Sequence, residues 1–240
     1  MAWTAACLLQ AWESAVGLPP PARTAVMLCA EGRVPDADAA LDLDVDTAAR
    51  LVGASLIESF GPTADLVVTC PACGEVLQAD VAVPHEPPPD TSAGGGGGLL
   101  SNGWVVRPPT LRELSSVYGT PEAAARLRAW CVTADRMDTG AEPGSAATVP
   151  LPGDEVLDEA MKAVAGAGLL DGAVECPECG ETFTAGLDLG HLLWGQVCLR
   201  APRILADVAA LARAYGWSER SILELSDARR AAYLEFAGGA

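Results

Sequence analysis

The chain has 240 residues, of which 50% are hydrophobic and 20% charged, and its 32 acidic and 15 basic residues give a formal net charge of −17. This amount of apolar material can form a core, which excludes wholesale disorder. The acidic excess excludes nucleic acid and anionic membrane surfaces as expected partners, because both would repel the chain. No run of 18 uncharged apolar residues and no signal peptide is visible, so we expect a cytoplasmic protein that does not span a membrane.

The first 83 residues read as three helices followed by a hairpin. Apolar residues at helical spacing predict a helix over 4–16, and a second helix follows the Pro19–Pro21 break and runs through Leu28. Asp46 or Thr47 is expected to cap a third helix that ends at Gly61-Pro62. Strand-like residues on both sides of Cys70-Pro-Ala-Cys73 predict a hairpin with the cysteines at its turn.

The middle of the chain alternates linkers with short elements. Residues 84–103, rich in Pro and Gly, and residues 140–152 have the composition of linkers. Between them we expect an extended segment at 104–107, a short helix capped by Thr110 and a helix over 121–131.

The last part begins with a helix from about 154 to 167 and a second hairpin around Cys176 and Cys179. A long helix follows, which Pro202 should kink and Gly216 should close. Ser218 and Asp227 are expected to cap two terminal helices.

The two cysteine hairpins form an internal repeat. Residues 68–83 and 174–189 align at an offset of 106 with seven of 16 positions identical, including both cysteines and the glycine that follows them. A helix precedes each copy, so the sequence predicts one helix–hairpin unit used twice. We therefore expect an α+β, mainly helical protein with two zinc-ribbon-like knuckles and a helical C-terminus. Its expected units are 1–83 (first knuckle), the linker 84–103, the short elements of 104–139, the linker 140–152, and 153–240 (second knuckle and terminal helices).

The Cys-Pro-x-Cys-Gly spacing is typical of a metal knuckle. Two intervening residues let both thiolates face one tetrahedral ion, and the glycine permits a tight turn. Since a closed structural site needs four ligands, the hypothesis is one structural zinc ion shared by Cys70, Cys73, Cys176 and Cys179. Iron in place of zinc, metal-free hairpins and disulfides are the alternatives.

The remaining candidates for chemistry have simpler interpretations. Four solitary cysteines are interpreted as inert thiols within helices: Cys7, Cys29, Cys131 and Cys198. His191 could replace a ligand near the second knuckle, but a surface or packing role is the better reading, and His85 borders a linker. The aspartates between 36 and 46 lack a calcium-loop pattern and are interpreted as helix caps or a solvated face. No phosphate-binding or nucleophile motif is found, so no catalytic residue is proposed.

Taken together, several segments make the chain similar to the baseplate proteins and baseplate hub assembly chaperones of contractile phage tails and phage-tail-like injection systems. The similarity lies in segments 8–13, 18–20, 70–75, 106–110, 176–180 and 211–234, of which the last is the most specific. It implies a non-enzymatic assembly or structural factor whose partners are baseplate, tail-tube or spike proteins, and it leaves open whether the protein stays in the finished particle.

The residues themselves leave two other functions open, a zinc-ribbon adaptor or regulatory protein and a thiol oxidoreductase that uses one Cys-x-x-Cys pair. The amphipathic segment after Tyr215 is the candidate partner contact through Trp217, Ile222 and Leu225, with packing onto the protein's own core as the alternative.

Overall fold

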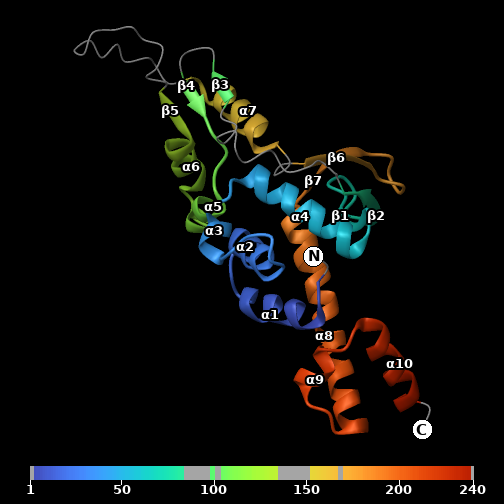
Figure 1. Ribbon diagram of the computed structural model, residues 1–240. Coiled ribbons are helices and arrows are strands. Elements are labelled where there is room, and N and C mark those ends of the chain that lie inside the picture. Colours follow the sequence, from blue (N-terminus) through green and yellow to red (C-terminus); the bar gives the residue numbers. More distant parts are fainter. Residues whose placement is uncertain (1–2, 84–97, 101–103, 135–151, 167–169, 239–240) are drawn as a thin grey trace.

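The computed structural model describes residues 3–83, 98–100, 104–134, 152–166 and 170–238. Figure 1 shows an elongated molecule in which small sheets lie at one end and a bundle of C-terminal helices lies at the other. Helices predominate and the sheets are short, as expected for an α+β, mainly helical fold. Among the described helices, none combines the length and the apolarity needed to cross a membrane.

The central body consists of helices packed around the first half of one long helix. α1 (Ala5–Ala15), α2 (Pro20–Ala30) and α4 (Val45–Phe60) contact α8 (Leu189–Tyr215), and the short α3 (Ala37–Leu41) lies against α2. The main core includes Leu28, Val52, Leu56, Leu193 and Val197, each at most 1% exposed. Apolar residues three and four positions apart put one face of each helix into this core.

Polar caps begin these helices. Thr4 caps α1, and Asp36 and Asp44 cap α3 and α4 by accepting hydrogen bonds from the backbone N–H three residues later. The predicted caps of α4, Asp46 and Thr47, are therefore wrong, because the helix starts two residues earlier, where both carboxylate oxygens of Asp44 bind Thr47. The neighbouring acids are helix caps or ion-pair partners of Arg50 and Arg112, as the sequence indicated for this stretch.

A second small core lies beside the body. β3 (Gly98–Leu100), β4 (Trp104–Val106) and β5 (Val132–Ala134) form an antiparallel sheet in that order. α5 (Leu111–Val117) and α6 (Ala123–Cys131) connect β4 to β5, and α7 (Asp154–Ala165) covers the sheet with Leu157, which is 1% exposed.

The predicted Pro/Gly linker 84–103 is too long at its C-terminal end. Its residues Gly98–Leu100 form β3, which pairs with β4 in the register Leu99 to Val105. This strand consists of the last glycine of the run and the two leucines after it. The linker prediction, which was based on the Pro and Gly content of the segment, did not include a strand here. The rest of that linker and the linker 140–152, except for its last residue, lie outside the described residues.

The repeat predicted from the sequence is present as two similar units. In the first, α4 precedes β1 (Thr63–Thr69) and β2 (Val76–Ala82), and in the second α7 precedes β6 (Leu170–Glu175) and β7 (Thr182–Leu187). Both hairpins are antiparallel and have the same register, since Thr69 pairs with Val76 and Glu175 pairs with Thr182. The offset of 106 residues therefore holds for the three-dimensional pairing as well as for the sequence.

The C-terminal helices extend the molecule beyond the body. α8 continues through Pro202 and ends at Gly216, whose φ of 68° lies in the left-handed region. α9 (Glu219–Leu223) is capped by Ser218, while Ser226 rather than the predicted Asp227 precedes α10 (Asp227–Gly238) and accepts a hydrogen bond from Arg229 N–H. α9 and α10 both pack on α8 (Figure 1).

Candidate metal centre

The two knuckles have the same local geometry. In the first, Cys70 N–H donates to the Glu75 carbonyl at 2.8 Å and Gly74 N–H donates to the Cys70 carbonyl at 2.9 Å. In the second, Cys176 and Gly180 make the equivalent bonds at the same two distances. Gly74 and Gly180 have φ of 77° and 72°, which a residue with a side chain rarely adopts. Each knuckle is thus a tight turn that aims both thiols out of one end of a hairpin.

The turns bring all four predicted ligands together. The Sγ atoms of Cys70, Cys73, Cys176 and Cys179 all lie within 4.8 Å of one another. The Cys70–Cys179 and Cys73–Cys176 sulfur distances, which join one hairpin to the other, are both 3.7 Å. The cluster therefore belongs to both repeats at once, although more than 100 residues separate the two cysteine pairs in the chain.

This arrangement fits a tetrahedral metal ion. Four sulfurs at about 2.3 Å from a central ion lie about 3.8 Å from one another, close to the two cross-hairpin distances. One thiol of each pair is buried, with Cys70 1% and Cys176 0% exposed, and its partner faces solvent. Leu77 and Phe183 pack beneath the cluster at equivalent repeat positions, so the thiols sit on a small apolar base.

The electrostatics of the cluster also favour a cation. The backbone N–H of Cys73 points at the Cys70 sulfur and lowers the pKa of that thiol to about 7, despite some burial. In the second knuckle, the hydrogen bond from the Glu181 N–H lowers the pKa of Cys179. Loss of solvent around the thiol and the three neighbouring sulfurs have the opposite effect, and the net result is a pKa raised to about 12. Four thiolates this close repel one another, and a divalent cation at their centre removes that repulsion.

The other cysteines and the described histidine lie outside this cluster. Cys131 is buried, and Cys7, Cys29 and Cys198 are half-buried. Burial, with Glu31 nearby, raises the pKa of Cys7 to about 11, and burial does the same for Cys131, which keeps both as thiols near neutral pH. His191 is exposed in the first turn of α8, where its N–H binds the capping Asp188, and His85 lies outside the described residues.

The structure separates the three residues predicted to contact a partner. Ile222 is completely buried, whereas Trp217 and Leu225 are half-buried. Trp217 packs against two tyrosines, Tyr215 and Tyr233, with ring centroids 4.8 and 4.9 Å away. The sequence interpretation missed this aromatic cluster, because Tyr233 lies on a different helix and only the packing of α10 on α8 brings its ring to Trp217.

Comparisons with known proteins give no assignment. No family model matches the chain, no curated protein matches it, and no solved structure matches it.

Proposed function

We propose that the protein is a non-enzymatic assembly or structural factor of a contractile-tail baseplate, built around one structural zinc ion. The observation that carries the structural part is the four-cysteine cluster that joins the two repeats. The part that concerns contractile tails is supported by the sequence segments that resemble baseplate proteins and their assembly chaperones.

Zinc is the proposed ion because four thiolates in tetrahedral array are a usual structural zinc site. Such a set fills every coordination position, so a substrate or water has no open position on the metal. In this proposal the ion holds the hairpin after α4 against the hairpin after α7 and thereby fixes the two halves of the molecule. Iron bound by the same four sulfurs is the alternative that metal analysis distinguishes.

A tail-assembly role also requires a contact with a tail component. We place that contact on the C-terminal helices, with Trp217 and Leu225 as candidate residues. Ile222 is left out because it is fully buried. The net charge of −17 supports such a role, since it opposes self-association of the free protein in the cytoplasm before assembly.

The test is deletion of the gene in the organism that makes the particle. Intact sheathed particles should disappear from electron micrographs while growth is unaffected, and the parent gene or the gene for the Cys198→Ser variant should restore them. A Trp217→Ala/Leu225→Ala variant that keeps its melting temperature should fail to restore them. Normal particles in the deletion strain would refute the tail function and leave the zinc adaptor as the better reading.

A further inference from the structure

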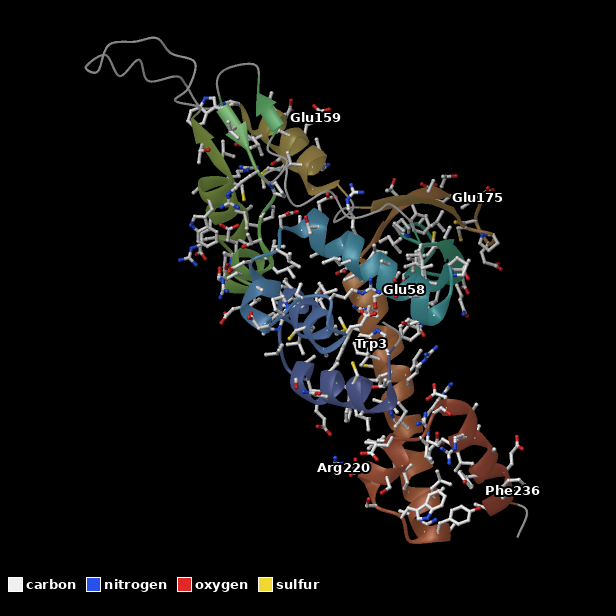
Figure 2. All side chains as sticks on the ribbon, in the orientation of Figure 1. Trp3, Glu58, Glu159, Glu175, Arg220 and Phe236 are labelled. Atoms are coloured by element: carbon white, nitrogen blue, oxygen red, sulfur yellow. The ribbon has the colours of Figure 1, made fainter. Side chains whose placement is uncertain are left out.

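The end of the molecule farthest from the sheets consists of the C-terminal helices. We call residues 200–238, which comprise the second part of α8 with α9 and α10, the C-terminal helical unit. Figure 2 shows Arg220 and Phe236 on this unit, whereas Glu159 and Glu175 lie at the opposite end on α7 and β6.

Aromatic side chains gather at one point of the C-terminal helical unit. The Trp217 ring stacks on Tyr215 and meets Tyr233 edge to face, with interplanar angles of 21° and 89°. Tyr215 Oη–H donates to the Tyr233 carbonyl at 3.2 Å and ties the end of α8 to α10. These three rings are held in place by one another, so their exposed edges form a preorganised surface.

α10 continues this surface outward. Arg229, Tyr233 and Phe236 follow at steps of four and three residues, which places them on one face of the helix. Arg229 is exposed, Tyr233 is half-buried and Phe236 is 71% exposed. The face thus presents tyrosine, tryptophan, phenylalanine and arginine, types that are enriched at protein interfaces and in their energetic centres.

The charge of this end differs from that of the rest of the chain. Residues 189–240 carry six arginines against five acids, whereas residues 1–188 carry nine bases against 27 acids. Among residues 1–188, five arginines form ion pairs with carboxylates: Arg33, Arg50, Arg107, Arg112 and Arg128. In the C-terminal helical unit, Arg220 and Arg230 form ion pairs, whereas Arg203, Arg213 and Arg229 have no carboxylate within ion-pair distance among the described residues.

The two ends of α8 are far enough apart that charges at one end have little electrostatic effect at the other. The 27 residues of α8 span about 40 Å, several times the screening length of about 8 Å at physiological ionic strength. Acidic groups at the sheet end of the molecule therefore have little influence on an anionic group bound near Tyr215, yet they repel that group elsewhere on the surface.

We propose that the face formed by Tyr215, Trp217, Arg229, Tyr233 and Phe236 docks an acidic, partly apolar protein segment of a different protein. Aromatic rings supply the apolar contact area, and Arg229, which has no carboxylate partner among the described residues, supplies charge complementarity. The inference rests on the proposed function only for the identity of the partner. Docking itself can be measured on the purified protein, without any tail particles.

A selection of random 12-residue peptides on the full-length, zinc-loaded protein tests this. Enriched peptides should carry net negative charge with at least one apolar anchor, and a synthetic copy should bind more weakly as salt increases. An Arg229→Glu/Phe236→Ala variant should bind that peptide at least tenfold more weakly with an unchanged melting temperature. The control is Arg126→Glu/Val156→Ala, which reverses the charge of an exposed arginine on α6 and truncates an exposed apolar side chain on α7, and it should stay within twofold of the parent.

Several outcomes would overturn the inference. They are a selection without enrichment, enrichment of basic peptides, and equal binding by the Arg229→Glu/Phe236→Ala variant and the parent. Two others identify a different occupant: self-association that this variant abolishes, which means a second copy, or capture of a labelled oligothymidylate by the same face, which means nucleic acid. If the peptide result holds and the deletion strain still makes particles, the surface stands and the tail function fails.

Discussion

Gly74 and Gly180 are the residues on which each knuckle depends. Each follows the second cysteine of its pair with a φ above 70°, and each donates its N–H to the carbonyl of the first cysteine. A side chain at either position meets no atom within 4 Å, so the cost of adding one comes from the backbone conformation and not from a clash. A substitution at either glycine therefore tests how the turn conformation affects metal binding by the thiols.

We predict that Gly74→Ala weakens metal binding because the left-handed conformation costs an alanine roughly 1–2 kcal/mol. That corresponds to a loss in zinc affinity of about tenfold, measurable by competition with a chromogenic chelator. Gly74→Asn should lose less, since asparagine tolerates this conformation better. Gly17→Ala, at φ 81° outside the site, should lower stability without changing zinc affinity, and an equal loss of affinity there would contradict this account.

At the scale of elements, the start of α8 lies unusually close to α2. A β-carbon at Gly190 would lie 2.4 Å from Thr24 Oγ1 and 3.2 Å from Asp188 Oδ1, the carboxylate that caps α8. Thr24 is itself buried and hydrogen-bonded to the Pro20 carbonyl. The absence of a side chain at Gly190 therefore permits the packing of these two helices.

Gly190→Ala should lower the free energy of unfolding by roughly 1–3 kcal/mol, because overpacking outweighs the helix propensity that alanine adds. Thermal or urea unfolding measures the change. Adding Thr24→Ala to this variant should recover part of the loss. Gly195→Ala, in the same helix with no atom within 4 Å, should leave stability unchanged or raise it, and a comparable loss there would show that the close contact is not the cause.

At the scale of the whole molecule, the cysteine cluster joins two hairpins that lie about 100 residues apart in the chain. Cys73 and Cys176 lie 103 residues apart, and the second hairpin carries α7 at one end and α8 at the other. Closing a loop of about 100 residues is worth about 5 kcal/mol for a covalent crosslink, and a metal clamp acts in the same way.

We predict about one zinc ion per chain, with Cys70→Ser and Cys176→Ser each abolishing it. A strong chelator should lower the melting temperature of the parent, and added zinc should restore it. Cys198→Ser, a half-buried cysteine outside the cluster, is the control that should behave as the parent does. Full zinc occupancy in Cys176→Ser, measured by elemental analysis, would show that the two pairs do not share an ion.

Much of the local structure could be predicted from the sequence because its causes are local. Apolar spacing, Thr110 and Ser218 as caps, and Gly216 as the end of α8 depend on residues within one or two turns. α3 was missed because its five residues, alanines, an aspartate and one leucine, show no apolar period. β3 and β5 were missed because three-residue strands exist only through their pairing with β4.

In the candidate site, too, some features have local causes and others depend on tertiary packing. The sequence by itself determined the two knuckles, since Cys-Pro-x-Cys-Gly fixes each turn within five residues. Only the tertiary structure decided that Cys70 lies 3.7 Å from Cys179, that Ile222 is interior, and that Trp217 and Tyr233 share one surface. These outcomes depend on how helices distant in the chain pack around α8, a sum of many weak contacts that no local pattern encodes.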